Sequence, residues 1–471
     1  MAYKNQYDQY VKEMLDGMDA YSVSITGRDE HPNLEKASEA SIQNFTDWAD
    51  PWNPLFNDEE YAKTTKYGGI IATPMYQDAI TTKIYFPHLP AEGGFMYHNF
   101  VGEDWWNLHE VHYDDTFTVT HSPTPWEDIT VDGEDTFSEF LFHFNVADAF
   151  NQNGQVIASV DSMMDVSILK ERLNAVADSL PYEDHYYTDE EWDYINRIID
   201  GEVIRGATPR YWEDVQPMEE IPPCTIGPTT RWDMVAFCAA RQELLFHPMR
   251  VWRHSTNMML MKDEFNVSHM DVEWHNSDKQ AAIMGDPRSF NYGASGRTQM
   301  ARLVTNWMGD DGELRAFKWR HLKRTYTGEC LIVQGRVVGK RITDDGEYVV
   351  DLDVWMDNPV RGNVSESALA TVVLPVKDPS DPDLASQCFD VSKKITLPLG
   401  TKVRIKDRTD LFPTGYPLAN AEGEVCHVYP WQRTSANSYG NYICVDIKKC
   451  DTVLGTGTKL FVKEENVEVM E

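Results

Sequence analysis

The sequence is poor in cysteine, with 7 in 471 residues, and the first of them is Cys224. No two of them have Cys-x-x-Cys spacing, which excludes a zinc ribbon and argues against a disulfide framework. The chain also lacks an apolar run near the ~18 residues of a membrane span, and its start lacks the basic and apolar regions of a signal peptide. We therefore expect a cytoplasmic protein with reduced cysteines.

Basic residues are scarce as well: 42 Lys and Arg stand against 76 Asp and Glu, a formal net charge of -34. Such a charge repels phosphate backbones and anionic lipid surfaces, so we expect no nucleic acid and no membrane partner. Walker, His-Glu-x-x-His and Gly-x-Ser-x-Gly motifs are absent, which excludes P-loop ATPases, zincins and serine hydrolases. We expect neither a metal nor a redox cofactor.

The composition, with 42% hydrophobic and 12% aromatic residues, is that of a globular protein of two or three domains. The acidity is uneven, because residues 395–471 carry 9 Lys and Arg and 10 Asp and Glu, a net charge of -1. A Pro-, Asp- and Ser-rich segment precedes this region and predicts a linker over 378–394. We expect a second linker over 171–212 and an N-terminal leader over 1–29.

A weak internal repeat relates the two remaining segments, 30–170 and 213–377. In each, Tyr-Gly precedes a run of helical period, and strand-like blocks with alternating apolar residues follow. In the first segment Thr73 and Pro74 predict the N-cap and the first helical position. A sheet wrapped round its own helix would bury both apolar faces, so the sequence predicts the α+β class and a double hot-dog fold.

Residues 395–471 contain short alternating strands separated by Gly, Pro, Asn and Asp turns. This pattern predicts a small all-β domain, an SH3-like barrel that is separable from the rest. Its aromatic residues Tyr416, Tyr429 and Trp431 could bind a peptide of a partner protein or could cap the end of the barrel.

Several segments resemble one known family. These are NFTDWADPWNPLFNDEEYAKTTKYGGIIATPMY at 44–76, and RYWEDV, Tyr-Gly-x-x-x-Arg and TNWMGDDG in the second half. They resemble the MaoC-like acyl dehydratase and (R)-specific enoyl-CoA hydratase family over most of 30–377. The resemblance implies a double hot-dog hydro-lyase that hydrates an α,β-unsaturated acyl thioester, usually of coenzyme A, or dehydrates the 3-hydroxyacyl thioester. A homodimer or higher homo-oligomer is expected.

The resemblance also nominates catalytic residues, which lie in the second half. Phe56 stands where the family has histidine, so the first half is expected to be catalytically silent, and Asn53 and Asp58 would only cap local turns. In the second half the spacing to Gly293 places the catalytic imidazole at His275, with Asp271 as its carboxylate. A second register nominates His269 with Glu264. The backbone N–H of Gly293 would lie in the oxyanion hole.

Five further residues are candidates for substrate binding. Arg250 could meet the phosphates of coenzyme A or form an internal ion pair, and Arg297 could approach the site entrance or pair with an acid such as Asp286. The acyl chain would run towards the first half. The candidates for substrate binding are Tyr292, Arg297, Arg250, Met75 and Ile71.

Two functions other than the hydro-lyase stay open. The protein could be a hot-dog thioesterase, or a degraded subunit that binds an acyl group or serves in assembly.

Overall fold

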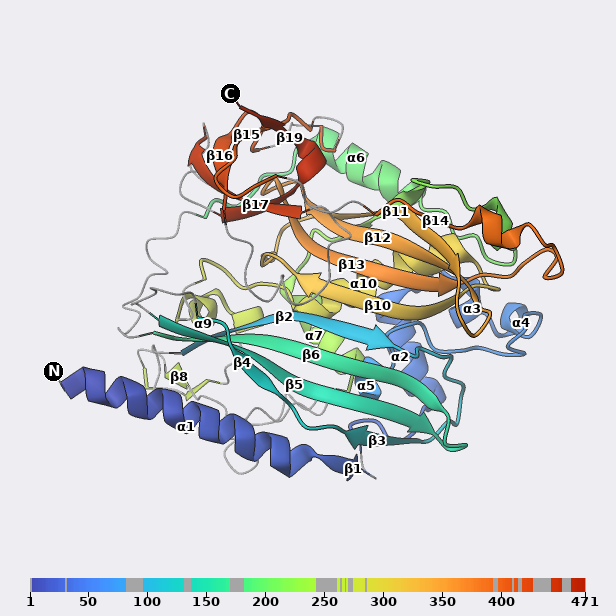
Figure 1. Ribbon diagram of the computed structural model, residues 1–471, viewed down its shortest axis with the longest axis horizontal. Helices are drawn as coiled ribbons and strands as arrows, with labels where there is room; N and C mark the ends of the chain where they lie inside the picture. The colour runs from blue at the N-terminus through green and yellow to red at the C-terminus, as the bar shows by residue number, and fades with distance from the viewer. Residues whose placement is uncertain are drawn as a thin grey trace. The chain divides into compact units, whose positions relative to one another are not determined.

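The computed structural model forms two compact units, each assembled from three segments of the chain (Figure 1). Unit 1 comprises Met1–Trp48, Met75–Leu180 and Arg231–Tyr292, and unit 2 comprises Ala49–Pro74, Pro181–Thr230 and Gly293–Glu471. The structure describes residues 2–29, 32–81, 96–130, 137–169, 182–242, 261–262, 265–266, 268–269, 274–283, 286–392, 397–408, 411–413, 417–426, 442–450 and 459–470.

Unit 1 is built on a long antiparallel sheet. Its strands run in the order β1-β3-β5-β6-β2, and β4 pairs with β5. The hairpin of β5 and β6 turns at Gly154, whose φ of 76° is a conformation that glycine adopts without steric cost. The strands are β1 (Gly27–Asp29), β2 (Met96–Trp106), β3 (Phe117–His121), β4 (Trp126–Asp128), β5 (Phe137–Asn151) and β6 (Val156–Leu169).

The helix α1 (Ala2–Ile25) lies along this sheet, although the sequence analysis assigned no secondary structure to residues 1–29 (Figure 1). Its Met14 and Met18 are fully buried and pack in one cluster with Phe142 and Met164. The segment therefore covers apolar sheet surface. The other described elements of unit 1 are α2 (Glu39–Ala49), which ends in unit 2, α5 (Asp78–Thr81), α7 (Arg231–Ala240), α9 (Asp278–Ile283), β8 (Met261–Lys262) and β9 (Ser268–His269).

The helix predicted to begin at Pro74 begins later. Residues 74–77 form turns, and α5 starts at Asp78 and contacts β3 and β5. Met75 has a φ of 74°, a left-handed conformation that a helix cannot contain. The hydroxyl of Thr73 has no hydrogen-bond partner among the described residues, so it caps none of the described helices.

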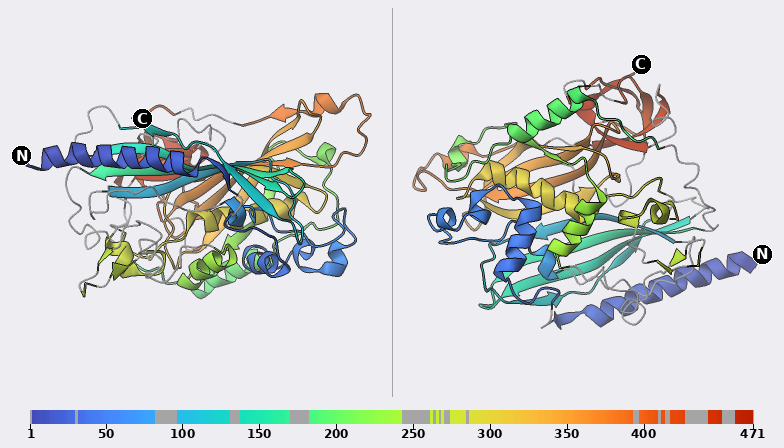
Figure 2. Two further views of the ribbon diagram at one scale, coloured as in Figure 1. Left: turned by 90° about the horizontal axis from the view of Figure 1, so that it is seen from below. Right: turned by 180° about the vertical axis from the view of Figure 1, so that it is seen from behind.

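In unit 2, α10 (Gly293–Met308) contacts β7, β10, β11, β12 and β13, which is the hot-dog arrangement (Figure 2). The strands run in the antiparallel order β10-β13-β12-β11-β14, and β7 pairs with β11. The α+β class is confirmed. The elements are β7 (Glu220–Ile226), β10 (Glu313–His321), β11 (Leu331–Ile342), β12 (Tyr348–Asn358), β13 (Asn363–Val373), β14 (Phe389–Asp390), α3 (Pro54–Asn57), α4 (Glu59–Ala62), α6 (Asp189–Asp200), η2 (Trp212–Asp214) and η5 (Leu384–Gln387).

The two units do not follow the contiguous domains predicted from the sequence. The segment predicted as a linker over 171–212 contains α6, whose capping box joins Thr188 and Glu191. The linker over 378–394 contains η5 and β14, and β14 pairs with β11. The boundaries of the predicted domains stay predictions.

The C-terminal region forms a separate five-stranded antiparallel sheet in the order β18-β17-β16-β15-β19. The SH3-like barrel stays a prediction, and Tyr416, Tyr429 and Trp431 lie outside the described residues. The elements are β15 (Lys402–Ile405), β16 (Glu422–Val425), β17 (Tyr442–Lys449), β18 (Lys459–Lys463), η6 (Glu464–Asn466) and β19 (Val467–Val469).

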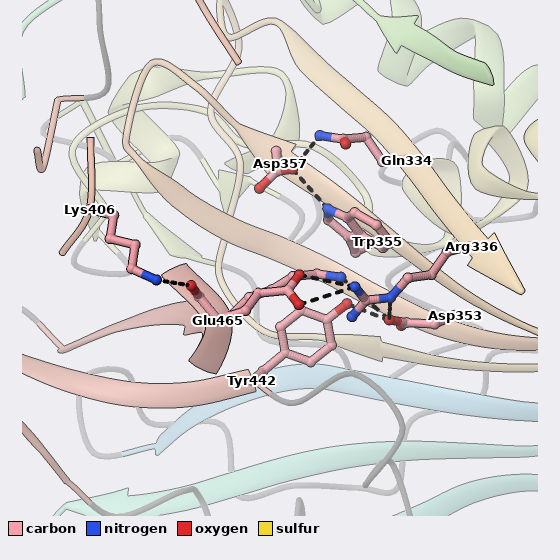
Figure 3. Close-up of polar contacts among 9 residues, drawn as sticks. Gln334, Arg336, Asp353, Trp355, Asp357, Lys406, Tyr442 and Glu465 are labelled. Carbon is pink, nitrogen blue, oxygen red and sulfur yellow. Dashed lines mark hydrogen bonds and ion pairs between the residues drawn. The ribbon is translucent and has the colours of Figure 1, made fainter. Parts of the chain in front are cut away.

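This C-terminal sheet is packed on the hot-dog sheet of unit 2. Ile332 of β11 belongs to the same hydrophobic cluster as Val403 of β15. Arg336 of β11 pairs with Glu465 at 3.1 Å, and the Tyr442 hydroxyl donates to Asp353 of β12 at 3.3 Å (Figure 3). The two sheets of unit 2 therefore share both an apolar core and buried polar contacts.

Candidate active site

His275 lies just before α9 in unit 1 and is 7% exposed. Its Nδ1 is 2.7 Å from the carbonyl oxygen of Phe290. Because a carbonyl can only accept, Nδ1 carries the hydrogen, and the neutral imidazole then has its lone pair on Nε2. This tautomer is the one that a general base needs if Nε2 is to take a proton.

Aromatic rings fix the plane of this imidazole. The ring of Tyr292 stacks on it with centroids 3.7 Å apart and an interplanar angle of 27°. Phe290 meets it edge-on at 4.6 Å, and Trp274 at 5.9 Å. Phe237 of α7 contacts Tyr292 in turn at 6.0 Å. The hydrogen bond sets the direction of the imidazole, and the rings restrict its rotation.

The loop that supplies Phe290 is attached to α9 by a carboxylate. Asp278 accepts from the backbone N–H of Ser289 at 2.9 Å and from its hydroxyl at 2.8 Å, and it pairs with Arg231. Burial raises the pKa of Asp278, but these hydrogen bonds and the guanidinium outweigh burial and hold the pKa below its usual value. The carboxylate is therefore charged at neutral pH and holds the loop in place.

In unit 2, α10 begins at Gly293, directly after Tyr292 in the chain. The first N–H groups of a helix have no partner within the helix, and the helix dipole places partial positive charge there. With 16 residues, α10 is long enough for this effect to be fully developed. The start of α10 is thus suited to a developing oxyanion.

The structure describes only some of the other predicted site residues. Asp271, Glu264 and Arg250 lie outside the described residues, and His269 is described only as part of the β9 backbone, opposite Met261. Arg297 has no exposed surface, so it does not lie at a solvent-facing entrance. Met75 in unit 1 and Ile71 in unit 2 are both buried.

The capping interpretation of the first half is confirmed. The Asn53 side chain accepts from the N–H of Leu55 at 3.1 Å and caps α3. The Asp58 carboxylate accepts from the N–H groups of Glu60 and Tyr61 at 3.0 Å and caps α4. Phe56 between these two caps is 2% exposed. Asn53 and Asp58 therefore stabilise the starts of two short helices, and the catalytic silence of the first half stays a prediction.

Unit 2 contains two buried acids that were not predicted from the sequence. Asp50, which is 3% exposed, lies near Thr305 of α10, and Glu366 of β13 faces α10 with 1% exposure. Burial raises the pKa of Asp50 to about 7, against the opposing effect of Arg302. Glu366 interrupts the small and apolar residues of its strand, and that interruption was the available signal. Asp50 gave none, because its burial depends on residues far along the chain.

No family model matches the chain, and no curated protein matches its sequence. Similar solved structures include a MaoC-like dehydratase, with a TM-score of 0.48, 12% identity, and coverage of 74% of this chain and 98% of that chain. A putative MaoC domain dehydratase from Chloroflexus aurantiacus J-10-fl has a TM-score of 0.43, 12% identity, and coverage of 75% and 96%. The chain resembles MaoC-like dehydratases in structure.

A Mycobacterium tuberculosis protein described as having a double hotdog fold is also similar, with a TM-score of 0.37, 9% identity, and coverage of 72% of this chain and 93% of that chain. Identities this low do not transfer residue roles. Within its described part, no group of three His, Cys, Asp or Glu side chains could hold a metal ion. No helix among the described residues is long and apolar enough to cross a membrane.

Proposed function

We propose that the protein is a hydro-lyase that adds water to an α,β-unsaturated acyl thioester of coenzyme A, or removes it from the 3-hydroxyacyl thioester. The observation that carries this proposal is the fixed tautomer of His275, whose Nδ1 donates to Phe290 and whose ring stacks on Tyr292. The chain continues directly from Tyr292 into Gly293 and α10. Acid–base chemistry and oxyanion stabilisation are the two requirements of the reaction.

In the hydration direction, Nε2 of His275 takes a proton from water as the water oxygen bonds to the β-carbon. The electrons of the carbon–carbon double bond then move towards the thioester carbonyl, whose oxygen becomes an enolate. The N–H of Gly293 donates to that oxygen. The imidazolium returns its proton to the α-carbon, which restores the neutral imidazole and completes the addition of one water molecule. Asp271 is proposed, from the resemblance, as the carboxylate partner of the imidazole in the proton transfer, while the Phe290 carbonyl accepts the Nδ1 hydrogen.

Most of the other candidate residues are assigned to binding of the thioester substrate. Tyr292 and Arg250 are proposed to contact the thioester, the buried Arg297 to pair with an acid such as Asp286, and Met75 and Ile71 to line the path of the acyl chain. The thioester is the substrate, and no further cofactor is needed, because the proton and the water supply all the atoms transferred. We also propose a homo-oligomer in the cytoplasm.

The experiment that tests this function uses crotonyl-CoA and longer or branched enoyl-CoA thioesters with the purified full chain. Hydration is expected to remove the absorbance of the conjugated enoyl group without release of free thiol. Release of free thiol would instead indicate the thioesterase. Binding of the thioesters without either change would favour an acyl-binding subunit, and both of these results would overturn the hydro-lyase.

A further inference from the structure

A buried carboxylate touches the first turn of α10. Glu366 lies on β13 and is 1% exposed, and its Cδ would lie 2.7 Å from a Cβ placed on Gly296. Both carboxylate oxygens would overlap that Cβ even more closely. Only glycine at position 296 therefore allows the helix backbone and this carboxylate to approach so closely.

Neighbouring side chains on β10 hold the carboxylate in this position. The indole N–H of Trp319 donates to Oε2 of Glu366 at 2.8 Å. His321 is the cross-strand partner of Glu366, and its Nδ1 lies 3.6 Å from Oε1. His321 is 5% exposed, and Nδ1 has no hydrogen-bond partner within the described part of the chain.

Packing alone does not explain an acid at this position. A buried carboxylate loses its hydration, which costs free energy unless hydrogen bonds and opposite charge compensate. The positive end of the α10 dipole and the Trp319 N–H supply part of that compensation. A leucine would fill similar volume at no such cost. The carboxylate therefore has a specific interaction with the start of the helix.

We propose that Glu366 is a positioning residue that fixes the first turn of α10, so that the N–H of Gly293 is held where the thioester oxygen becomes negative. This inference rests on the proposed function. Glu366 acts through the helix backbone and through Gly296, and it does not exchange protons with the substrate. A displacement of about 1 Å at a reacting centre costs about 100-fold in rate, so fixing this turn has a measurable effect.

The test compares Glu366→Gln, Glu366→Ala and Gly296→Ala in the full chain, with Glu347→Gln as a matched control on a carboxylate that is 40% exposed. Each variant is measured for thermal midpoint, for kcat and KM with crotonyl-CoA, and for the dissociation constant of butyryl-CoA, which has no double bond to hydrate. Gln keeps the shape and the acceptor for Trp319, so Glu366→Gln is expected to stay within about threefold of wild type in kcat. Glu366→Ala and Gly296→Ala are expected to lower kcat about 10- to 100-fold. They are also expected to weaken the binding of butyryl-CoA, because its carbonyl oxygen would accept from the same N–H.

The thermal midpoint of Gly296→Ala is expected to rise when Glu366→Ala is added, because the second substitution removes the overlapping atoms. An inactive wild type would overturn the proposed function but not this inference, which the butyryl-CoA measurement then decides. Weaker binding in Glu366→Ala and Gly296→Ala, with Glu366→Gln unchanged, would support it. Unchanged kcat in both alanine variants, or unchanged binding where the wild type is inactive, would show a purely structural carboxylate. A wild type that binds no butyryl-CoA would also overturn the inference.

Discussion

At the scale of single residues, the imidazole of His275 has a defined direction because Phe290 accepts its Nδ1 hydrogen. If Nε2 moves the proton, His275→Ala should lower kcat about 10²- to 10⁴-fold, the range for loss of a positioned acid–base group. The thermal midpoint should fall as well, because the imidazole is buried and stacks on Tyr292, so kcat is compared at a temperature where both proteins are folded. His269→Ala serves as the control for the alternative register, and a larger loss of kcat in that variant would reverse the assignment. Steady-state kinetics with crotonyl-CoA measure both.

Asp50 predicts a pH dependence of stability. Its pKa of about 7 in the folded protein lies above the ordinary value of 3.8, so the folded state binds the proton more tightly than the unfolded state. Stability should therefore fall as pH rises from about 4 to 7, by up to about 4 kcal/mol from this group. Asp50→Asn should flatten that fall, and the exposed Asp47→Asn should leave it unchanged. Urea unfolding of the wild type and both variants at pH 5 and pH 8 measures how much the free energy of unfolding changes with pH. The same change in all three proteins would contradict the raised pKa of Asp50.

The sequence predicted the capping residues of the first half but not the buried acids of unit 2. The caps at Asn53 and Asp58 depend on neighbours within three residues, so local pattern was sufficient. The burial of Asp50 depends on Thr305, which is 255 residues away. The contact of Glu366 with Gly296 likewise requires the register of a strand against a helix. A local sequence pattern can mark Glu366 as unusual, but it does not identify the distant residue that Glu366 or Asp50 contacts.

At the scale of elements, the sequence predicted strands better than helix ends. Alternating apolar residues predicted strand-like blocks after the helical run of the first half, and β5 and β6 are paired strands of this kind. The start of α5 was misplaced because a Thr-Pro pair fits a helix start, whereas Met75 is held in a left-handed conformation. The helix α1 was missed because no sequence pattern identifies the surface it covers.

The packing of α1 gives a matched pair of substitutions. Met18 has no exposed surface and packs in the cluster with Phe142 and Met164, whereas Val23 on the same helix is 79% exposed. Met18→Ala should cost about 2–5 kcal/mol through lost burial and an unfilled cavity. Val23→Ala should cost less than about 0.5 kcal/mol. Urea unfolding of both variants is the measurement, and similar losses would mean that α1 does not pack on the sheet in solution.

At the scale of the whole molecule, the duplicated pattern predicted the α+β class, but the charge break near 395 overstated the independence of the C-terminal sheet. Composition reports the linker and the change in charge, yet it cannot report shared burial. Ile332 packs in the same cluster as the C-terminal strands. Lys463, which is 2% exposed, pairs with Asp353 at 3.4 Å, and burial lowers the pKa of this lysine to about 8 despite the nearby carboxylate.

We therefore expect the C-terminal sheet to be required for stability, in contrast to the separable domain predicted from the sequence. A chain ending at Lys377 would expose Ile332 and leave Asp353 without its lysine, so it should unfold at a lower temperature or aggregate. In the full chain, Lys463→Ala should cost about 3 kcal/mol, because it leaves a buried carboxylate less well compensated. Lys448→Ala is the control: its side chain is 59% exposed and pairs with Asp446 at 2.6 Å, so its loss should change the stability little. Differential scanning calorimetry of the truncated chain and the two lysine variants, each compared with the wild type, measures the melting temperature. An unchanged melting temperature of the truncated chain would support a separable C-terminal domain.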